Sequence, residues 1–238
     1  MSTIDRTDRL DPKVPVEEAA VFLDPSPHAL EMGVQRLDSG QLLVAARTHM
    51  PGCSGRMFEW WFRFAPDTRQ YAWWHPLDHV SSRWVETSPR THVGSTHLVE
   101  ERLGAEEVYE LQIHFIDPAE LFGAEAVQEA LDAGHVSAIV AAQLGTGAEP
   151  LRDERGRPNM GRMAHIARDT PDGMVLRSRF WLGAGTGLPP EQLEQIIPGS
   201  TGLGLMQHAL TEFTFLSRIL PPLYAAENRD TEAVVLPW

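Results

Sequence analysis

The chain has almost no cysteine and no long apolar run. Cys53 is the only cysteine among 238 residues, which excludes an intramolecular disulfide and a thiolate metal cluster. A lone cysteine of this kind is more often a small buried apolar residue than a nucleophile. The first twenty residues carry charges and prolines in place of the apolar core of a signal peptide. No stretch approaches the roughly 18 apolar residues that a membrane span needs, so we expect a cytoplasmic protein.

Positive charge and aromatic residues are also scarce. With 20 Lys and Arg against 33 Asp and Glu, the formal net charge is −13. Such a chain repels nucleic acids and anionic membranes, and no run of basic residues offsets the balance. Only 8% of the residues are aromatic, yet five tryptophans lie close together in the sequence, at Trp60, Trp61, Trp73, Trp74 and Trp84. The composition favours a small neutral ligand or a cation as partner, with these tryptophans in a pocket wall or an interface.

Apolar periodicity and turn signals predict an α+β fold. Residues 1–30 are polar and broken by prolines, so we expect an N-terminal arm with one short helix near residues 17–23, followed by a single domain over 31–238. The expected strands cover residues 33–37, 41–48, 71–75, 96–102, 107–116, 135–144, 162–168 and 174–182. The expected helices cover residues 54–65, 118–133, 189–197 and 200–220, the last stopped by Pro221 and Pro222. Antiparallel strands followed by one long helix suggest a sheet that wraps the helix and leaves a cavity between them.

Two titratable residues on the last helix suggest a metal site. His208 and Glu212 are four residues apart and so share one face. The spacing alone is weak, because His97 and Glu101 repeat it. The helix is apolar nearly all round, which indicates burial. A buried ionised glutamate is unfavourable unless it is paired, and no Lys or Arg lies on this helix before Arg218. A cation is the simplest partner; a hydrogen-bonded core histidine beside a protonated glutamate is the alternative.

Two further segments carry candidate ligands. In residues 71–79, Pro76 ends the expected strand and the following turn presents Asp78 and His79, so that a histidine ligand and its orienting group could come from one turn. Ordinary polar turn residues are the alternative. In residues 107–116, alternation places Glu110 on the polar face of a strand, opposite an apolar face. Periodicity alone makes that polar face the wet one, and a metal-binding role requires Glu110 to point into the cavity.

Longer motifs add a family resemblance. Residues 48–52 (THMPG), 57–62 (MFEWWF), 74–79 (WHPLDH) and 177–183 (RSRFWLG) resemble the diacetylphloroglucinol/phloretin hydrolases, and the resemblance runs from about residue 33 to 217. It implies a helix-grip fold, Bet v 1-like, in which a curved antiparallel sheet surrounds a long C-terminal helix. It also implies a zinc ion held by a histidine, a strand glutamate and a His-x-x-x-Glu pair. In this sequence these positions fall on His79, Glu110, His208 and Glu212.

The resemblance leaves an alternative for the first two ligands and assigns the pocket. His75 and Glu106 have the same 31-residue spacing as His79 and Glu110. We choose His79 because Tyr71 then lies eight residues upstream, where the family has a substrate-binding tyrosine. The other expected substrate contacts are Trp74, Ser82 in place of a family asparagine, and Phe180 in place of a second tyrosine. The resemblance and the chemistry together make His165, Tyr71 or His75 the expected proton donor.

The implied reaction is metal-dependent hydrolysis of the carbon–carbon bond between an acyl group and a polyhydroxylated ring of a small aromatic ketone. Zn²⁺ is expected, and Fe²⁺ and Mn²⁺ are compatible with the same nitrogen and oxygen ligands. Two rivals remain: a helix-grip binding or cyclase-type protein that acts on an aromatic polyketide without hydrolysis, and a metal-stabilised structural domain. The native substrate and the oligomeric state stay open, a homodimer being one option.

Overall fold

An eight-stranded antiparallel sheet forms the centre of the computed structural model, which describes residues 11–103 and 106–229. The strand order is β1-β2-β8-β7-β6-β5-β4-β3. The strands are β1 (Gly33–Arg36), β2 (Leu42–Pro51), β3 (His79–Val85), β4 (Thr96–Arg102), β5 (Val108–Ile116), β6 (Ala138–Thr146), β7 (Gly161–Thr170) and β8 (Gly173–Leu182). The first hairpin joins the last through the β2–β8 pairing, which runs from Leu42 opposite Leu182 to Pro51 opposite Gly173.

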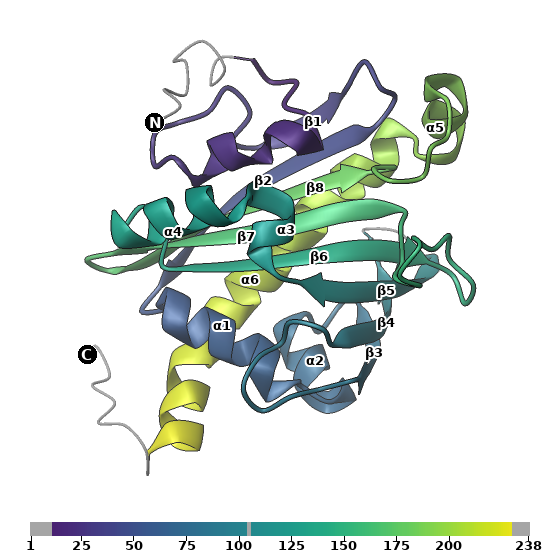
Figure 1. Ribbon diagram of the computed structural model, residues 1–238. Coiled ribbons are helices and arrows are strands. Elements are labelled where there is room, and N and C mark those ends of the chain that lie inside the picture. The colour runs from purple at the N-terminus through teal and green to yellow at the C-terminus, as the bar shows by residue number, and fades with distance from the viewer. Residues whose placement is uncertain (1–10, 104–105, 230–238) are drawn as a thin grey trace.

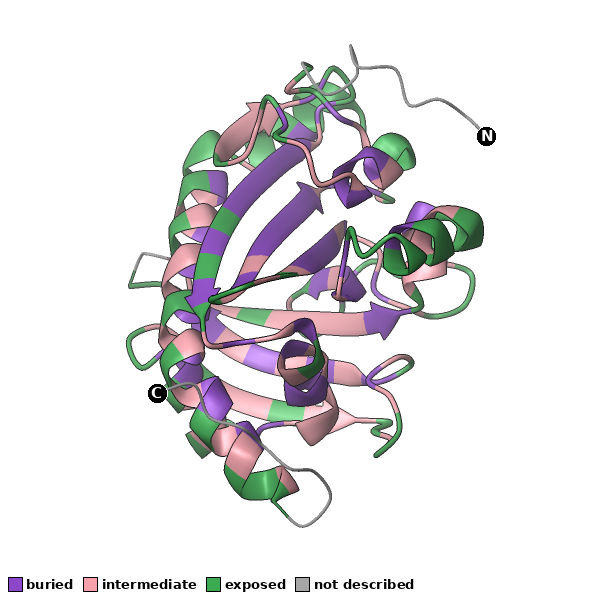
Figure 2. Cartoon of the chain, turned by 90° about the vertical axis from the view of Figure 1, so that its left-hand side faces the viewer, coloured by how far each residue is buried: buried purple, intermediate pink, exposed green. Residues whose placement is uncertain are grey.

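Helices cover both faces of the curved sheet (Figures 1 and 2). They are η2 (Val16–Leu23), α1 (Gly55–Phe64), α2 (Thr68–Trp74), α3 (Pro118–Phe122), α4 (Ala124–Asp132), α5 (Pro190–Ile196) and α6 (Gly199–Asn228). The long α6 crosses one face, here called the inner face, whereas η2, α3 and α4 lie on the outer face. This arrangement confirms the predicted α+β helix-grip fold. Within the described residues, no helix is both long enough and apolar enough to cross a membrane.

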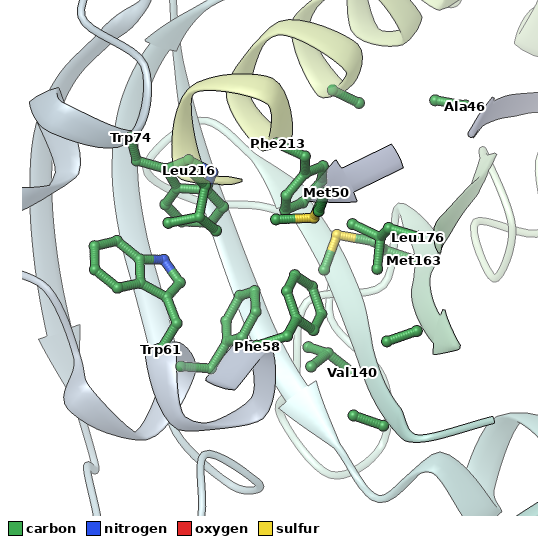
Figure 3. Close-up of a cluster of buried hydrophobic side chains, with 14 of the residues drawn as sticks. Ala46, Met50, Phe58, Trp61, Trp74, Val140, Met163, Leu176, Phe213 and Leu216 are labelled. Atoms are coloured by element: carbon green, nitrogen blue, oxygen red, sulfur yellow. The ribbon is translucent and has the colours of Figure 1, made fainter. Parts of the chain in front are cut away.

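The main hydrophobic core lies between the inner face, α1 and α6. Figure 3 shows Phe58 of α1 on the side of Phe213 of α6 and Met50 of β2, and Trp61 of α1 on the side of Trp74. The helix α1 begins at Gly55 because the Ser54 side chain accepts a hydrogen bond from the Met57 N–H. Its aromatic side chains then recur at helical spacing and face the core. This packing fixes α6 against the sheet and so fixes the position of every side chain that α6 carries.

The segment expected to be an arm packs on the outer face over residues 11–30. Phe22 of η2 is buried, with its ring centroid 6.0 Å from that of Trp181. Buried Arg177 donates hydrogen bonds to the Asp24, Pro25 and Ser26 carbonyls. The short helix expected near residues 17–23 is present as η2. The first ten residues of the predicted arm lie outside the described residues.

Residues 71–75 were predicted as a strand, and this prediction is wrong. A helix, α2, begins after Asp67, whose side chain accepts from the Gln70 N–H while the Gln70 side chain accepts from the Asp67 N–H. Such a reciprocal cap satisfies two backbone donors at a helix start. Tyr71 and Trp74 are three residues apart and both buried, as one helical face requires, whereas Trp73 is 44% exposed. The aromatic run is therefore helical, and it delivers Tyr71 and Trp74 to the inner face.

The long helix does not stop at Pro221 and Pro222, as the sequence predicted, but continues to Asn228. Proline lacks an N–H, so the Ser217 carbonyl has no partner one turn later. The Cys53 thiol lies 3.7 Å from that carbonyl oxygen and donates to it. Beyond the prolines, the Tyr224 ring packs edge-on against Trp60 of α1, with centroids 5.2 Å apart. Tertiary contacts thus offset the lost helical hydrogen bonds.

Candidate active site

A cavity of about 530 Å³ lies between α6 and the inner face of the sheet. Most of its wall is apolar and comes from β5 to β8, α5 and the start of α6. The titratable side chains that line it come mainly from α2, β4, β7 and α6, and the histidines and carboxylates central to the site are His97, Glu101, His165, His208 and Glu212. Such a mostly apolar cavity with a few convergent polar groups is typical of a small-molecule site.

Two histidines and two glutamates converge beside this cavity; Glu101, His208 and Glu212 line it, and the buried His79 adjoins them. The Nε2 atoms of His79 and His208 are 3.3 Å apart. The Glu101 Oε2 atom is 3.7 Å from each of these nitrogens. The Glu212 Oε2 atom is 3.7 Å from His79 Nε2 and 4.0 Å from His208 Nε2. All four residues are buried. They come from β3, β4 and α6, so the fold, and not local sequence, assembles the cluster.

Both imidazoles are oriented with their Nε2 lone pairs toward the centre of the cluster. His79 Nδ1 is 2.8 Å from the Tyr71 carbonyl oxygen, which can only accept, so Nδ1 carries the proton. His208 Nδ1 donates to the Asp78 carboxylate at 3.1 Å. Histidines that bind metals characteristically donate the other ring N–H in this way. Two facing lone pairs 3.3 Å apart repel each other unless a cation or a proton lies between them.

The charges of the cluster also favour a cation at its centre. Among the described residues, neither Glu101 nor Glu212 has a Lys or Arg ion-pair partner. Burial raises the pKa of Glu212 to about 8. Burial opposes protonation of His208, yet Glu101, Asp78 and Glu212 raise its pKa to about 9. Four ligand atoms around one Zn²⁺ ion at 2.0–2.1 Å stand roughly 3.4 Å apart, close to the spacings found here. The donor set therefore fits a divalent cation.

The structure brings together three of the four predicted ligands, His79, His208 and Glu212, and places Glu101, not Glu110, beside them. Glu110 is exposed on the outer side of β5, where it pairs across the ladder with Glu100. The prediction that Glu110 points into the cavity is wrong, because alternation gives the inner face to its neighbours Tyr109 and Leu111. Glu101 of β4, opposite both His79 and Tyr109, occupies that place. The sequence held two signals for it: the His97–Glu101 spacing, and the alternation that buries both residues.

The alternative pair, His75 and Glu106, does not form a ligand pair. Glu106 is exposed. His75 is buried but does not line the cavity; its ring stacks on His208 at 4.7 Å, and its Nε2 lies 3.4 Å from the Asp78 carboxylate that holds His208. His75 Nδ1 accepts from the Asp78 N–H. This position suits support of His208 and Asp78 better than proton transfer to a ligand in the cavity.

The other expected pocket residues divide into two groups. Tyr71, Trp74, His165 and Phe180 line the cavity. The Tyr71 hydroxyl donates to Glu101 at 2.5 Å, and its ring stacks on His79 at 3.6 Å. Ser82 does not line the cavity; its hydroxyl donates to the Pro66 carbonyl oxygen and contacts His97. The sequence analysis gave His97 no role, although it is a buried cavity residue four positions before Glu101.

The fold and the buried cluster together define a helix-grip protein with a candidate metal site. The model of one family, described as the DAPG hydrolase PhiG domain, matches residues 14–225. The chain therefore belongs to this family, which confirms the resemblance found in the motifs.

Curated relatives agree with the family match. The 2,4-diacetylphloroglucinol hydrolase of Pseudomonas protegens is 29% identical over 241 residues, covering 91% of this chain and 74% of the relative. The phloretin hydrolase of Eubacterium ramulus is 30% identical over 210 residues, covering 81% and 70%. Among solved structures, protein Ms6760 from Mycobacterium smegmatis aligns at 16% identity with a TM-score of 0.43, covering 81% of this chain and 98% of its own. Ara h 8.0201 aligns at 10% identity with a TM-score of 0.43, covering 79% and 98%.

Proposed function

We propose that this protein is a metal-dependent hydrolase that cleaves the carbon–carbon bond between an acyl group and a polyhydroxylated aromatic ring. The observation that carries the proposal is the grouping of His79, Glu101 and His208, with Glu212 beside both histidines, next to an apolar cavity that Glu101, His208 and Glu212 line. Relatives named as hydrolases of diacetylphloroglucinol and phloretin support the substrate class. In the reaction, the oxygen of water joins the acyl carbon to give a carboxylic acid, and a hydrogen joins the ring carbon.

The four residues would hold the cation, with Zn²⁺ preferred and Fe²⁺ or Mn²⁺ compatible. A bound divalent cation would supply Lewis acidity toward the acyl carbonyl oxygen and toward water. Two glutamates balance the charge of a divalent ion, which suits a buried site whose glutamates have no Lys or Arg partner among the described residues. Asp78 and the Tyr71 carbonyl hold the two imidazoles in the tautomer that keeps Nε2 free. The Tyr71 hydroxyl fixes the orientation of Glu101.

His165 is the proposed proton carrier for the departing ring carbon. Its Nδ1 lies 2.8 Å from the Ser178 hydroxyl, which leaves Nε2 for exchange with the cavity. Burial among aromatic side chains lowers the pKa of His165 to about 3. The resting imidazole is therefore neutral, and the proton released once the water oxygen has joined the acyl carbon would make it an acid strong enough to protonate the ring carbon. Hydroxyl groups ortho to the acyl group stabilise the departing ring by delocalising its electrons, so acetophenone should not react.

The apolar part of the cavity supports a substrate bulkier than an acetylated phenol. Ile113, Leu144 and Leu182 lie on one transverse row of the inner face, because Ile113 pairs with Leu144 and both Leu144 and Leu182 pair with Gly161. Ile197 and Leu205 face this row across the cavity. Such a wall offers no hydrogen bonds and favours an extended acyl chain, since each buried methylene contributes about 0.8 kcal/mol.

A second function, binding or cyclisation of an aromatic polyketide without hydrolysis, is favoured by one feature. Phe180 contributes a ring without a hydroxyl to the cavity, and most of the wall is equally apolar. A protein of that kind would bind phenolic ketones and release no carboxylic acid. Product analysis therefore separates the two functions.

The test joins metal analysis to a substrate panel. Purified protein should contain about one divalent metal per chain and should release a carboxylic acid from ortho-hydroxylated acylphenols, with activity lost on chelation and restored by Zn²⁺. Glu212→Gln should lose both metal and activity. Glu129→Gln, on the exposed side of α4, is the matched control and should lose neither. A protein without affinity for divalent metals would refute the metal site. A protein that binds acylphenols tightly but releases no carboxylic acid from them would support the second function in place of hydrolysis.

A further inference from the structure

His97 is a buried cavity residue that no step of the proposed reaction uses. It lies on β4 with only 2% of its surface exposed and shares the inner face of that strand with Glu101. Its ring stacks on Trp84, with centroids 4.1 Å apart and planes inclined by 16°. The Tyr71 ring meets it edge-on at 5.1 Å. The imidazole is thus held in one plane at the cavity wall, on the far side of Tyr71 from the stacked His79.

The tautomer of His97 follows from its neighbours. Its Nε2 lies 2.8 Å from the Ser82 Oγ, which in turn lies 2.8 Å from the Pro66 carbonyl oxygen. Two oxygens so close need a proton between them, and the carbonyl has none, so Ser82 donates its only hydrogen to Pro66. The Ser82 oxygen then accepts from His97, and Nε2 carries the proton. The Nδ1 atom, which has no hydrogen-bond partner in the described parts of the chain, is left as an acceptor.

We propose that His97 Nδ1 accepts a hydrogen bond from a ring hydroxyl of the substrate and so selects free phenols over their ethers. The inference rests on the proposed function for the phenolic class of ligand. An Nδ1 lone pair accepts from a hydroxyl, whereas it repels an ether oxygen, which has no hydrogen to give. The relay from His97 through Ser82 to Pro66 prevents the ring from presenting an N–H in that place. Ser82 is therefore a positioning residue.

Two observations support this role. Burial lowers the pKa of His97 to about 3, so the ring stays neutral and keeps its acceptor at physiological pH. The neighbouring polar groups of the cavity are already engaged: the Tyr71 hydroxyl donates to Glu101, and Glu212 lies against both cluster histidines. His165 contrasts with His97, because within residues 11–103 and 106–229 the Ser178 hydroxyl has no second hydrogen-bond partner that fixes the direction of its hydrogen. Of His97 and His165, His97 is thus the one with a determined acceptor.

The test measures binding and needs no turnover. Dissociation constants for phloroglucinol and for its trimethyl ether, neither of which has an acyl group to lose, are obtained by calorimetry on the metal-loaded protein. The wild type should prefer phloroglucinol, and His97→Phe, which keeps the aromatic ring, should reduce that preference by roughly ten-fold or more. His97→Asn places an amide oxygen near the position of Nδ1 and should retain most of it. Ser82→Ala should cause an intermediate loss of this preference, because the His97 imidazole can then rotate and present its N–H to the ligand.

His92→Phe is the matched control. His92 is also buried, and its imidazole ring has no hydrogen-bond partner among the described residues, but it does not line the cavity. The control should keep the wild-type preference. An unchanged preference in His97→Phe would overturn the proposal. If that variant does not fold, ¹⁵N NMR of the wild type decides: the proposal requires the Nε2–H tautomer and a shift of the Nδ1 resonance on addition of phloroglucinol, and absence of either overturns it.

The outcomes also separate this inference from the proposed function. Hydrolysis of acylphenols with an unchanged preference in His97→Phe would refute the role of His97 alone. A preference that depends on His97, in a protein that releases no acid from any acylphenol, would refute the hydrolase alone.

Discussion

Glu101 and Glu110 lie on neighbouring strands and carry the same side chain in opposite surroundings. Glu101 is 6% exposed, accepts from the Tyr71 hydroxyl and lies 3.7 Å from two imidazole nitrogens. Glu110 faces away from the cavity and is exposed. At the scale of single residues, the direction of one carboxylate therefore decides whether it can bind a metal.

The pair gives a matched prediction. Glu101→Gln keeps the shape of the side chain but removes a charge and a ligand oxygen, so metal affinity should fall by roughly ten-fold or more. Glu110→Gln should leave it unchanged. Competition with a chelator of known affinity measures both variants. If Glu110→Gln lost metal affinity and Glu101→Gln did not, Glu110 would again be the expected ligand, as the family resemblance implied.

The sequence could bring His79, His208 and Glu212 together as one candidate site because each lies in a family motif or at helical spacing. It could not place Glu101, because a spacing of 31 residues taken from the family resemblance takes no account of the length of the β3–β4 connection in this chain. The antiparallel register settles the matter: Glu101 pairs with His79 on one side and Tyr109 on the other. Register depends on pairing between distant segments, and a single sequence does not display it.

At the scale of elements, α2 is a seven-residue helix that supplies both Tyr71 and Trp74 to the site. Its start depends on the Asp67 cap, since a helix this short has little stability of its own. Asp67→Ala should lower the free energy of unfolding by about 1 kcal/mol. It should also weaken metal binding, because the Tyr71 carbonyl orients His79. Urea unfolding and a chelator competition measure the two effects, and Glu129→Ala on exposed α4 should change neither.

Local signals predicted most elements, and the failures are those where tertiary contacts override them. The Tyr and Trp residues of 71–74 favour a strand by propensity, yet the Asp67–Gln70 cap and burial against the inner face make a helix. Pro221 and Pro222 normally end a helix, but Trp60 and the Cys53 thiol stabilise the continuation. Neither partner is near in sequence, so neither effect is visible from the local pattern.

The buried hydrogen bond from the Cys53 thiol to the Ser217 carbonyl leads to a prediction about the reactivity of Cys53. Burial raises the pKa of its thiol to about 12, so almost no thiolate exists at neutral pH. Native protein should therefore react with a thiol reagent at least a hundred-fold more slowly than protein unfolded in urea. Rapid labelling of the native protein would contradict both the burial of Cys53 and its hydrogen bond to Ser217.

At the scale of the whole molecule, buried neutral histidines make stability depend on pH. Burial, with a smaller effect of Arg63, lowers the pKa of His92 to about 4 from 6.5. The unfolded chain takes up a proton near pH 6.5 and the folded chain does not. The stabilisation is thus complete above pH 6.5 and is lost as the pH falls toward 4.

This loss of stability at low pH should differ measurably between the wild type and a variant without His92. Between pH 7 and pH 5, His92 should account for a loss of about 2 kcal/mol of unfolding free energy. His92→Phe should remove that part of the pH dependence, as urea unfolding at both pH values would show. The exposed His135 offers a control, and His135→Phe should follow the wild-type profile. Identical profiles for wild type and His92→Phe would mean that His92 takes up its proton without unfolding.

The division of the cavity between two sets of elements has a consequence for how this scaffold can change. The four proposed metal ligands come from β3, β4 and α6, whereas the apolar wall comes largely from β5 to β8 and α5. On the proposed function, substitutions at Leu144, Leu182 or Ile197 should therefore change the accepted acyl chain without displacing a proposed ligand. Catalytic capacity and substrate range are separately mutable, and a library confined to these three positions should yield folded, metal-loaded variants with altered preferences. A scaffold divided in this way is suited to acquiring new substrates by small steps.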